Sequence, residues 1–482
     1  MVALGSINGW QPAHGPVVTW TASAVAREAA RTAPRSDLPA TYQQFQHVRI
    51  AHYAKAMGRQ LPRLMVVAWD IPGVCDIAAM TAAINAHVRR HDTYHNWFEF
   101  DNDDVVRHAI DDVEAVEFLP VQSGNMDVAQ IRAHAMTTTP ETLEWDCFTF
   151  GAIQHSEYFT FYASVDHLHI DGISGSLIFL DIHLAYQRSQ LAAPLTLPPA
   201  GSYSDYTMRQ HEQLAGLTSS SPQVKDWLKF AHDTDGDWPS FPLPLGDTWA
   251  SNRGDFLTVD LLDAAQTESF DTVCRAAGAR FSGGILACAA LAEREFTGAD
   301  TYYGFTPYDT RTPGIDTMSV GWFASLIPVT VPTGAGCFFE SAPAAQKAFD
   351  SAKHLAGVPL ERVLELTTPD QPAIKLPTRP AMMVSFLDFR KIPIAALWEE
   401  TNFGAYGDNL SHGGINIWIN RHATKTTVTI SFPDNPTARD SVHRYISALT
   451  QAFAAVAETT SRWADVVADH ANSSHAVPAI TL

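Results

Sequence analysis

The chain has 482 residues, of which 46% are hydrophobic and 17% are charged, a balance typical of a folded globular protein and not of a disordered one. Its formal net charge of −20 argues against nucleic acid as a partner, because phosphate binding needs clustered lysine and arginine, and against simple electrostatic docking on an anionic membrane. The length exceeds what one hydrophobic core usually holds, so two domains are expected.

The first half of the chain alternates strand and helix patterns. The predicted elements are a β-like patch at 17–20, a helix at 41–57, a buried strand at 64–69, an amphipathic helix at 76–88 and a hairpin around 101–104. The helix at 76–88 runs into three basic residues, which suit the negative end of the helix dipole.

The segment around Val165 to Ile173 organises the rest of the chain. An aromatic, strand-like run at 158–164 precedes it, and a helix with an apolar stripe at 174–186 follows it. His167 and Asp171 therefore lie where a strand stops and a helix starts, and Gly172 would permit a tight turn there. Because the ordinary pKa of histidine lies near neutrality, His167 can act as a general base, while Asp171 can hold the loop in shape.

The composition shifts between residues 188 and 250, where prolines recur around one predicted helix that contains Trp227. Such a stretch is typical of a connection between domains. The second half then resumes the helix-and-strand pattern. We expect strands at 256–261, 301–306, 325–331, 415–419 and 426–431, and helices at 263–277, 282–292 and 439–457.

Five cysteines are few, odd in number and widely spaced, and none forms a Cys-x-x-Cys pair, which favours reduced thiols in the cytoplasm. The first residues lack the basic start and apolar run of a signal peptide. No window reaches the ~18 apolar residues of a spanning helix. We expect a cytoplasmic protein, either free or attached peripherally at the inner face of the plasma membrane.

Two other chemistries compete for the segment at 165–173. His167-x-His169, with Asp166 and Asp171 beside it and His183 in the next helix, offers ligands for zinc or iron. Residues 172–176 (GISGS) nearly spell the Gly-x-Ser-x-Gly turn of serine hydrolases, but the last glycine is a serine. Dinucleotide-binding and P-loop glycine motifs are absent from the sequence, which removes those two classes. We expect neither a metal nor a cofactor.

The segment 166–172 (DHLHIDG) resembles the HHxxxDG motif of the CoA-dependent acyltransferase superfamily, which includes chloramphenicol acetyltransferase and the condensation domains of peptide synthetases. The similarity is closer to the trehalose-acylating branch of the mycobacterial polyketide-associated (Pap) acyltransferases. Four further segments resemble that branch, namely 89–98 (RRHDTYHNWF), 145–148 (WDCF), 321–323 (GWF) and 432–436 (FPDNP). The similarity extends nearly from end to end of the chain.

The resemblance implies a role for each motif position. His167 matches the catalytic histidine of the family. Asp166 stands where the family has its first histidine, a position that the resemblance implies to be mainly structural. Asp171 is then structural too, because it turns away and pairs with an arginine, for which Arg311 is the best match, and Gly172 is a backbone requirement.

The resemblance also implies the fold. We expect an α/β protein of two chloramphenicol-acetyltransferase-like sandwich domains, 1–217 with the motif and 218–482, in a V arrangement with a channel between them. The segment at 321–323 resembles the part of the family that lines this channel, so Trp322 and Phe323 are candidate channel residues. Both can also be read as core aromatics. Ser174, or a backbone N–H near Gly172, could help to hold an oxyanion.

The resemblance implies O-acyl transfer from an acyl-CoA, or from an acyl thioester on a polyketide synthase, to a hydroxyl of trehalose or a trehalose glycolipid. Acyl-CoA is a substrate in this reading, and the enzyme is expected to be a monomer active in glycolipid biosynthesis. Three alternatives remain at this point. They are a condensation-type amide synthase, a catalytically weak acyl-CoA-binding scaffold favoured by Asp166, and a metal hydrolase.

Overall fold

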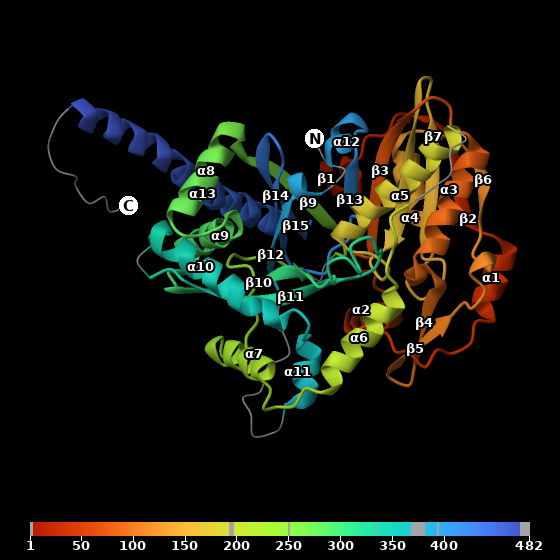
Figure 1. The fold of residues 1–482 in the computed structure, drawn as a ribbon, viewed down its shortest axis with the longest axis horizontal. Coiled ribbons are helices and arrows are strands. Elements are labelled where there is room, and N and C mark those ends of the chain that lie inside the picture. Colours follow the sequence, from red (N-terminus) through yellow and green to blue (C-terminus); the bar gives the residue numbers. More distant parts are fainter. Residues whose placement is uncertain are drawn as a thin grey trace. The chain divides into compact units, whose positions relative to one another are not determined.

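The computed structural model describes residues 3–191, 197–248, 251–334, 336–367, 381–392 and 395–472. The chain divides into two compact units, each with its own mixed sheet and helices (Figure 1). The first unit consists of Met1–Leu217, Asp309–Ser325 and Ile392–Leu410, and the second of Thr218–Tyr308, Leu326–Lys391 and Ser411–Leu482. The expected α/β class with two units is thus confirmed.

The first unit contains a seven-stranded sheet in the order β1-β13-β3-β8-β7-β2-β6. Its strands are β1 (Ala3–Ser6), β2 (Gly15–Ala22), β3 (Leu64–Pro72), β6 (Phe118–Met126), β7 (Phe148–Gln154), β8 (Tyr158–Asp166) and β13 (Gly404–Gly407). A separate hairpin pairs β4 (Asn96–Asp101) with β5 (Asp104–Ala109). The predicted strands at 17–20, 64–69 and 158–164 and the predicted hairpin are confirmed.

The helices of the first unit cover both faces of this sheet. They are α1 (Ala24–Arg31), α2 (Tyr42–Ala56), α3 (Ile77–Arg90), α4 (Val128–Thr137), α5 (Gly172–Gln190) and α6 (Tyr203–Ala215). Figure 1 shows α3, α4 and α5 beside the strands of this half, and α3 packs against α5. The predicted helices at 41–57, 76–88 and 174–186 correspond to α2, α3 and α5.

Alternation along β3 explains how the sheet carries helices on both sides. Val66 and Ala68 belong to a core cluster that also contains Ile131 of α4. Trp69, which points to the other face, lies edge-on against Phe179 of α5, with ring centroids 5.1 Å apart. Successive residues of a strand face opposite sides, so the apolar run of β3 packs against helices on both faces of the sheet.

Two features of the first unit differ from the sequence predictions. The stretch at 188–250 contains two helices, α6 and α7 (Pro222–Asp233), where one was expected around Trp227, and α6 belongs to the first unit. The division at 217 and 218 is also incomplete as a description. The segments Asp309–Ser325 and Ile392–Leu410 return to the first unit from the second half of the chain, and the latter places β13 between β1 and β3.

The second unit contains a six-stranded sheet in the order β11-β10-β12-β14-β15-β9. Its strands are β9 (Gly254–Asp263), β10 (Thr301–Asp309), β11 (Ala324–Pro332), β12 (Met383–Asp388), β14 (Asn416–Arg421) and β15 (Lys425–Pro433). Its helices are α7, α8 (Ala264–Ala276), α9 (Phe281–Thr297), α10 (Phe338–Ala352), α11 (Leu360–Leu366) and α13 (Pro436–Asn472), while α12 (Ala395–Glu400) belongs to the first unit. All strands and helices predicted between 256 and 457 are present.

One large apolar core holds the second unit together. Helices α8, α9 and α13 pack against one another, as Figure 1 shows, and their buried side chains meet the inward residues of β14 and β15. Ile417 and Ile419, two apart on β14, both belong to this core. In the part of the chain that the structure describes, no helix is long and apolar enough to cross a membrane.

Helix α9 carries an acidic residue into this core. Glu293 is half-buried, but its Oε2 atom is enclosed and has no hydrogen-bond partner among the described residues. Burial raises the pKa of this carboxyl from 4.5 to about 8. The folded chain therefore keeps a proton on Glu293 up to about pH 8, whereas the unfolded chain releases it near pH 4.5. The stability that this proton contributes is fully present at low pH and is lost as the pH rises.

We predict that Glu293→Gln removes part of the pH dependence of stability. The free energy of unfolding of the natural chain should fall between about pH 4.5 and about pH 8 because of Glu293, and the variant should be the more stable of the two at pH 8. Urea unfolding at four pH values measures this. Glu295→Gln, an exposed change of the same kind on α9, is the matched control and should keep the natural slope. An unchanged slope in Glu293→Gln would contradict the prediction.

Candidate active site

The turn between β8 and α5 is held by its own backbone. His167 N–H donates to Arg63 O at 2.7 Å, and His169 N–H donates to Asp166 O at 3.0 Å. Asp171 then caps α5, because its Oδ1 accepts from Ser174 N–H at 2.9 Å. A carboxylate at this position satisfies an unpaired amide and suits the positive end of the helix dipole. His167 is thereby fixed between the end of a strand and a capped helix.

His167 is half-buried, and its Nδ1 atom is enclosed with no hydrogen-bond partner in the described part of the chain. The ring of Trp322 lies against it, with centroids 4.1 Å apart and planes at 53°. Burial lowers the pKa of His167, and the nearby His47 lowers it further, against opposing contributions from its own carbonyl and from Asp171. A lowered pKa keeps the imidazole neutral near pH 7, which is the form that accepts a proton.

Asp171 and Arg311 form a buried bidentate ion pair. Arg311 Nη1 lies 2.9 Å from Asp171 Oδ2, and Arg311 Nη2 lies 2.9 Å from Asp171 Oδ1. Burial alone would raise the pKa of Asp171, but Arg311 outweighs burial and lowers it. The carboxylate is therefore ionised and bound by Arg311, the pairing that the resemblance implied. Two parallel N–H···O bonds also fix the orientation of both groups.

The same ion pair holds the segment that carries Trp322. Phe323 N–H donates to Asp171 Oδ2 at 3.0 Å, and Gly321 N–H donates to Ser174 Oγ at 3.1 Å. Arg311 adds a contact from its guanidinium to the face of the Phe323 ring, at 4.2 Å. Residues 309–325 are thus bound to the start of α5 by side-chain and backbone bonds together.

The three predicted channel residues have different positions. Trp322 is half-exposed beside His167, which suits a residue that meets substrate. Phe323 is fully buried in a cluster with Tyr203 and Tyr206, so it is a core aromatic and the channel assignment is corrected. Ser174 is also fully buried, and its hydroxyl is shared between Asp171 and Gly321. It braces the turn and is not free to meet an oxyanion.

Asp166 is fully buried and accepts four hydrogen bonds. Its Oδ1 accepts from His47 Nε2 at 2.8 Å and from Leu168 N–H at 2.9 Å, and its Oδ2 accepts from Thr142 Oγ1 at 2.7 Å and from Arg63 Nη1 at 3.1 Å. Burial opposes ionisation, but His47 and Arg63 outweigh it and lower the pKa of Asp166. A charged carboxylate with four donors is well satisfied inside a protein.

The expectation for Gly172 is corrected by its surroundings. A Cβ atom at Gly172 would meet no atom within 4 Å, and the residue does not have a positive φ angle. Gly175, one helical turn later, is the more tightly packed of the two glycines. Its Cβ would lie 3.1 Å from Val67 Cγ1, so a side chain there would have to displace Val67 slightly.

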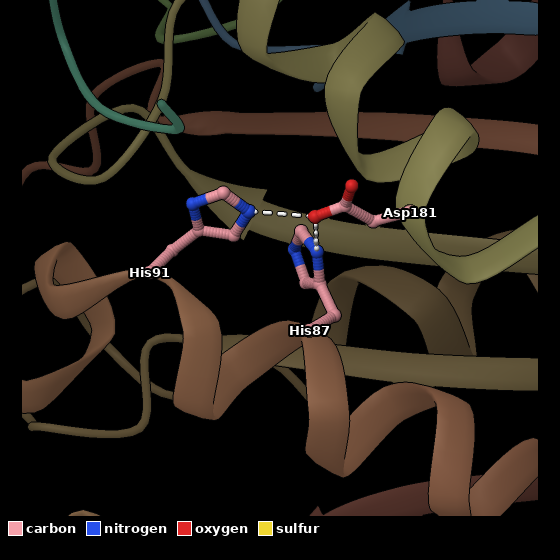
Figure 2. A group of neighbouring side chains, drawn as sticks. All are labelled: His87, His91 and Asp181. Atoms are coloured by element: carbon pink, nitrogen blue, oxygen red, sulfur yellow. Dashed lines mark hydrogen bonds and ion pairs between the residues drawn. The ribbon is translucent and has the colours of Figure 1, made fainter. Parts of the chain in front are cut away.

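The side chains of the metal interpretation are dispersed over separate partners. His169 Nδ1 lies 3.2 Å from Thr93 Oγ1, and His183 Nε2 lies 2.8 Å from the Gln187 amide, while Asp166 and Asp171 are bonded as described. Across the described ranges, the group of possible metal ligands that does converge is a different one, made of His87, His91 and Asp181 (Figure 2).

Sequence reasoning missed several residues of the site. His47 on α2 bonds Asp166 and lies edge-on to Trp322, with centroids 5.5 Å apart. Tyr203 at the start of α6 donates its hydroxyl to Trp322 O at 2.9 Å. Each is a single residue far from the motif in sequence, so no spacing pattern pointed to it.

Comparisons with known proteins find a family model and similar acyltransferases. A family model described as the condensation domain matches residues 55–377. Acyltransferase PapA3 of Mycobacterium tuberculosis is 45% identical over 464 residues, 95% of this chain and 97% of PapA3. Trehalose-2-sulfate acyltransferase PapA2 of the same organism is 44% identical over 465 residues, 95% of this chain and 98% of PapA2. The solved structure of PapA2 acyl transferase superposes with a TM-score of 0.91 at 44% identity, over 95% of this chain and all of that chain.

We predict that Arg311→Met strongly destabilises the first unit. The change keeps side-chain volume but leaves Asp171 buried without its partner, which typically costs about 3–5 kcal/mol. Urea unfolding followed by tryptophan fluorescence measures the loss. Asp309→Asn is the control, because Asp309 also contacts Arg311, at 3.1 Å, but its side chain is 42% exposed. That variant should lose less than about 1 kcal/mol. Equal losses of unfolding free energy in the two variants would show that the buried pair stabilises the protein no more than the partly exposed contact does.

Proposed function

The chain belongs to the condensation-domain family and is an acyltransferase of the mycobacterial Pap group, and on this premise we propose that His167 is its general base for O-acyl transfer to a trehalose-type acceptor. The observation that carries the proposal is the environment of His167. His167 is half-buried, its pKa is lowered, and it stands on a turn that the Asp171–Arg311 pair braces.

In this mechanism the acceptor hydroxyl gives its proton to the neutral imidazole of His167 as its oxygen attacks the thioester carbonyl. The C–O bond forms, the carbonyl becomes a tetrahedral oxyanion, and the imidazolium then protonates the departing thiolate as the C–S bond breaks. Nδ1 of His167 is enclosed, so Nε2 is the atom that exchanges the proton. Trp322 forms one wall beside this ring.

The transfer is direct, without a covalent acyl-enzyme. A nucleophilic serine would need a base within hydrogen-bond distance and a free hydroxyl. Ser174, the first serine after His167 in the chain, is buried and bonded to Asp171 and Gly321. It supports the turn, and His167 is left to activate the acceptor itself.

The donor is a long-chain or polyketide-derived acyl thioester, carried by CoA or by a polyketide synthase, and the acceptor is trehalose or a trehalose glycolipid. The acceptor follows the printed name of PapA2, a trehalose-2-sulfate acyltransferase. The enzyme acts as a monomer and meets its lipid substrates peripherally at the inner face of the plasma membrane. Acyl-CoA is consumed as a substrate and CoA is released as a product, so no bound cofactor is needed.

The scaffold interpretation relied on Asp166 in place of histidine. Here the four donors to Asp166 leave the turn intact, so the substitution gives no reason to expect lost activity. An amide synthase would use the same histidine with an amine acceptor. Trehalose offers only hydroxyls, so the two reactions are separated by supplying each acceptor in turn.

We predict that His167→Gln lowers kcat about 10²- to 10⁴-fold, the usual worth of a positioned general base. Thiol release from palmitoyl-CoA with trehalose measures the rate. His169→Gln is the matched control, because His169 is a buried neighbour whose Nδ1 bonds Thr93. It should lose far less activity. Natural rates in a folded His167→Gln would remove His167 from the mechanism.

The pH dependence of kcat/KM tests the same residue independently. Because the pKa of His167 is lowered from 6.5, activity should persist below pH 6.5 before it falls as the base becomes protonated. His47 contributes to that lowering, so His47→Gln, whose amide can still donate to Asp166, should move the fall to higher pH. A fall in His47→Gln that moves to lower pH, or does not move, would contradict the assignment.

A further inference from the structure

Three buried side chains meet between helices α3 and α5 of the first unit (Figure 2). His91 Nε2 lies 2.7 Å and His87 Nδ1 lies 3.2 Å from the same oxygen, Oδ2 of Asp181. Arg90 Nε is 3.1 Å from that oxygen as well. None of these residues takes part in the mechanism above.

The partners of His91 determine which nitrogen carries its proton. Val320 N–H donates to His91 Nδ1 at 3.3 Å, so Nδ1 has a lone pair and the proton of a neutral ring is on Nε2. That Nε2–H is the donor to Asp181. Burial lowers the pKa of His91 to about 4, so the ring is neutral at ordinary pH. His87 has the same pattern of contacts: its Nδ1 faces Asp181, and its Nε2 lies 3.3 Å from the Tyr94 hydroxyl.

The same proton positions disfavour a metal ion. A metal at this cluster would need the lone pair of His91 Nε2, and the ring would then carry its proton on Nδ1, facing the Val320 N–H. Both groups would be donors at 3.3 Å. The Arg90 guanidinium would add a second cation beside the same carboxylate oxygen. The hydrogen bonds of His91 to Asp181 and Val320 therefore account for both nitrogens of its ring without a metal ion.

The Nδ1 atom of His91 binds the segment that lies beside the proposed base. Val320 is two residues before Trp322, whose ring lies against His167. The next amides along the chain, those of Gly321 and Phe323, are bound by Ser174 and Asp171. His91, which follows the last residue of α3, thus holds one of the three amides of this segment that side chains bind, those of Val320, Gly321 and Phe323.

Resting on the function proposed above, we propose that His91 is a positioning residue for acyl transfer. Asp181 fixes the tautomer of His91, His91 holds the Val320 amide, and this bond keeps Trp322 in place against His167. The role is distinct from support of the fold, because it depends on the acceptor at Nδ1 and not on the bulk of the ring.

Three variants separate these roles. His91→Phe keeps the ring shape and removes both bonds. His91→Asn places an amide oxygen near the Nδ1 position, where it can accept from Val320, but it does not reach Asp181. His87→Phe is the matched control, since it removes a histidine from Asp181 without touching Val320. Each is measured by steady-state thiol release, by thermal unfolding, and by hydrogen exchange of peptides that cover 316–324.

We expect His91→Phe to lower kcat about 10-fold or more and to speed amide exchange in 316–324, the scale that a small misplacement near the reacting groups produces. His91→Asn should recover most of both properties. His87→Phe should lower the melting temperature while kcat and exchange in 316–324 stay near natural values.

Equal kcat losses in His87→Phe and His91→Phe, or unchanged exchange in 316–324 in a folded His91→Phe, would overturn the proposal. So would stoichiometric zinc in dialysed protein that is lost in both phenylalanine variants. If His91→Phe does not fold, His91→Asn decides the matter alone, because a kcat loss there without faster exchange in 316–324 contradicts positioning. If the natural protein shows no activity with any acyl acceptor, the proposed function is refuted instead. The exchange results would still test the bond to Val320.

Discussion

The buried pair of Asp171 and Arg311 is the interaction on which the rest of the site depends. It joins the first turn of α5 to a segment more than 130 residues later, and both side chains are nearly fully buried. Burying two charges is costly, and the cost is met only where each charge has complete partners. Asp171 has them, because Arg311, Ser174 and Phe323 N–H all bond to its two oxygens. The pair therefore fixes the position of the turn that carries His167 relative to the segment that carries Trp322.

Around this pair, two histidines connect a buried carboxylate to the segment that carries Trp322. His47 bonds Asp166 and packs on Trp322, and His91 bonds Asp181 and the Val320 amide. In each case a buried carboxylate, Asp166 or Asp181, orients the imidazole. The imidazole then contacts the segment at 320–322. Within the described ranges, no carboxylate is bonded to the ring of His167, and only its Nδ1 atom is enclosed, which leaves Nε2 to exchange a proton.

Much of the fold follows from local sequence signals. The aromatic run before the motif and the apolar stripe of α5 are both visible in the sequence, and they place His167 at the end of a strand. The partner of Asp171 came from resemblance. Long-range placement was not predictable in the same way, because β13 enters the sheet between β1 and β3 from residue 404, and no local pattern encodes that neighbour. Trp322 and Phe323 are adjacent and alike in the sequence, yet backbone alternation exposes one and buries the other.

A double-mutant cycle on kcat tests the central role of the ion pair most directly. Asp171→Asn, Arg311→Met and the combined variant are compared under conditions where all three are folded. If the pair acts as one unit that positions His167, the double variant loses little more activity than either single variant. The first change alone already removes the bonds that hold the turn and the segment together. Losses that simply multiply would show that Asp171 and Arg311 act independently, and that the buried pair does not control the position of the base.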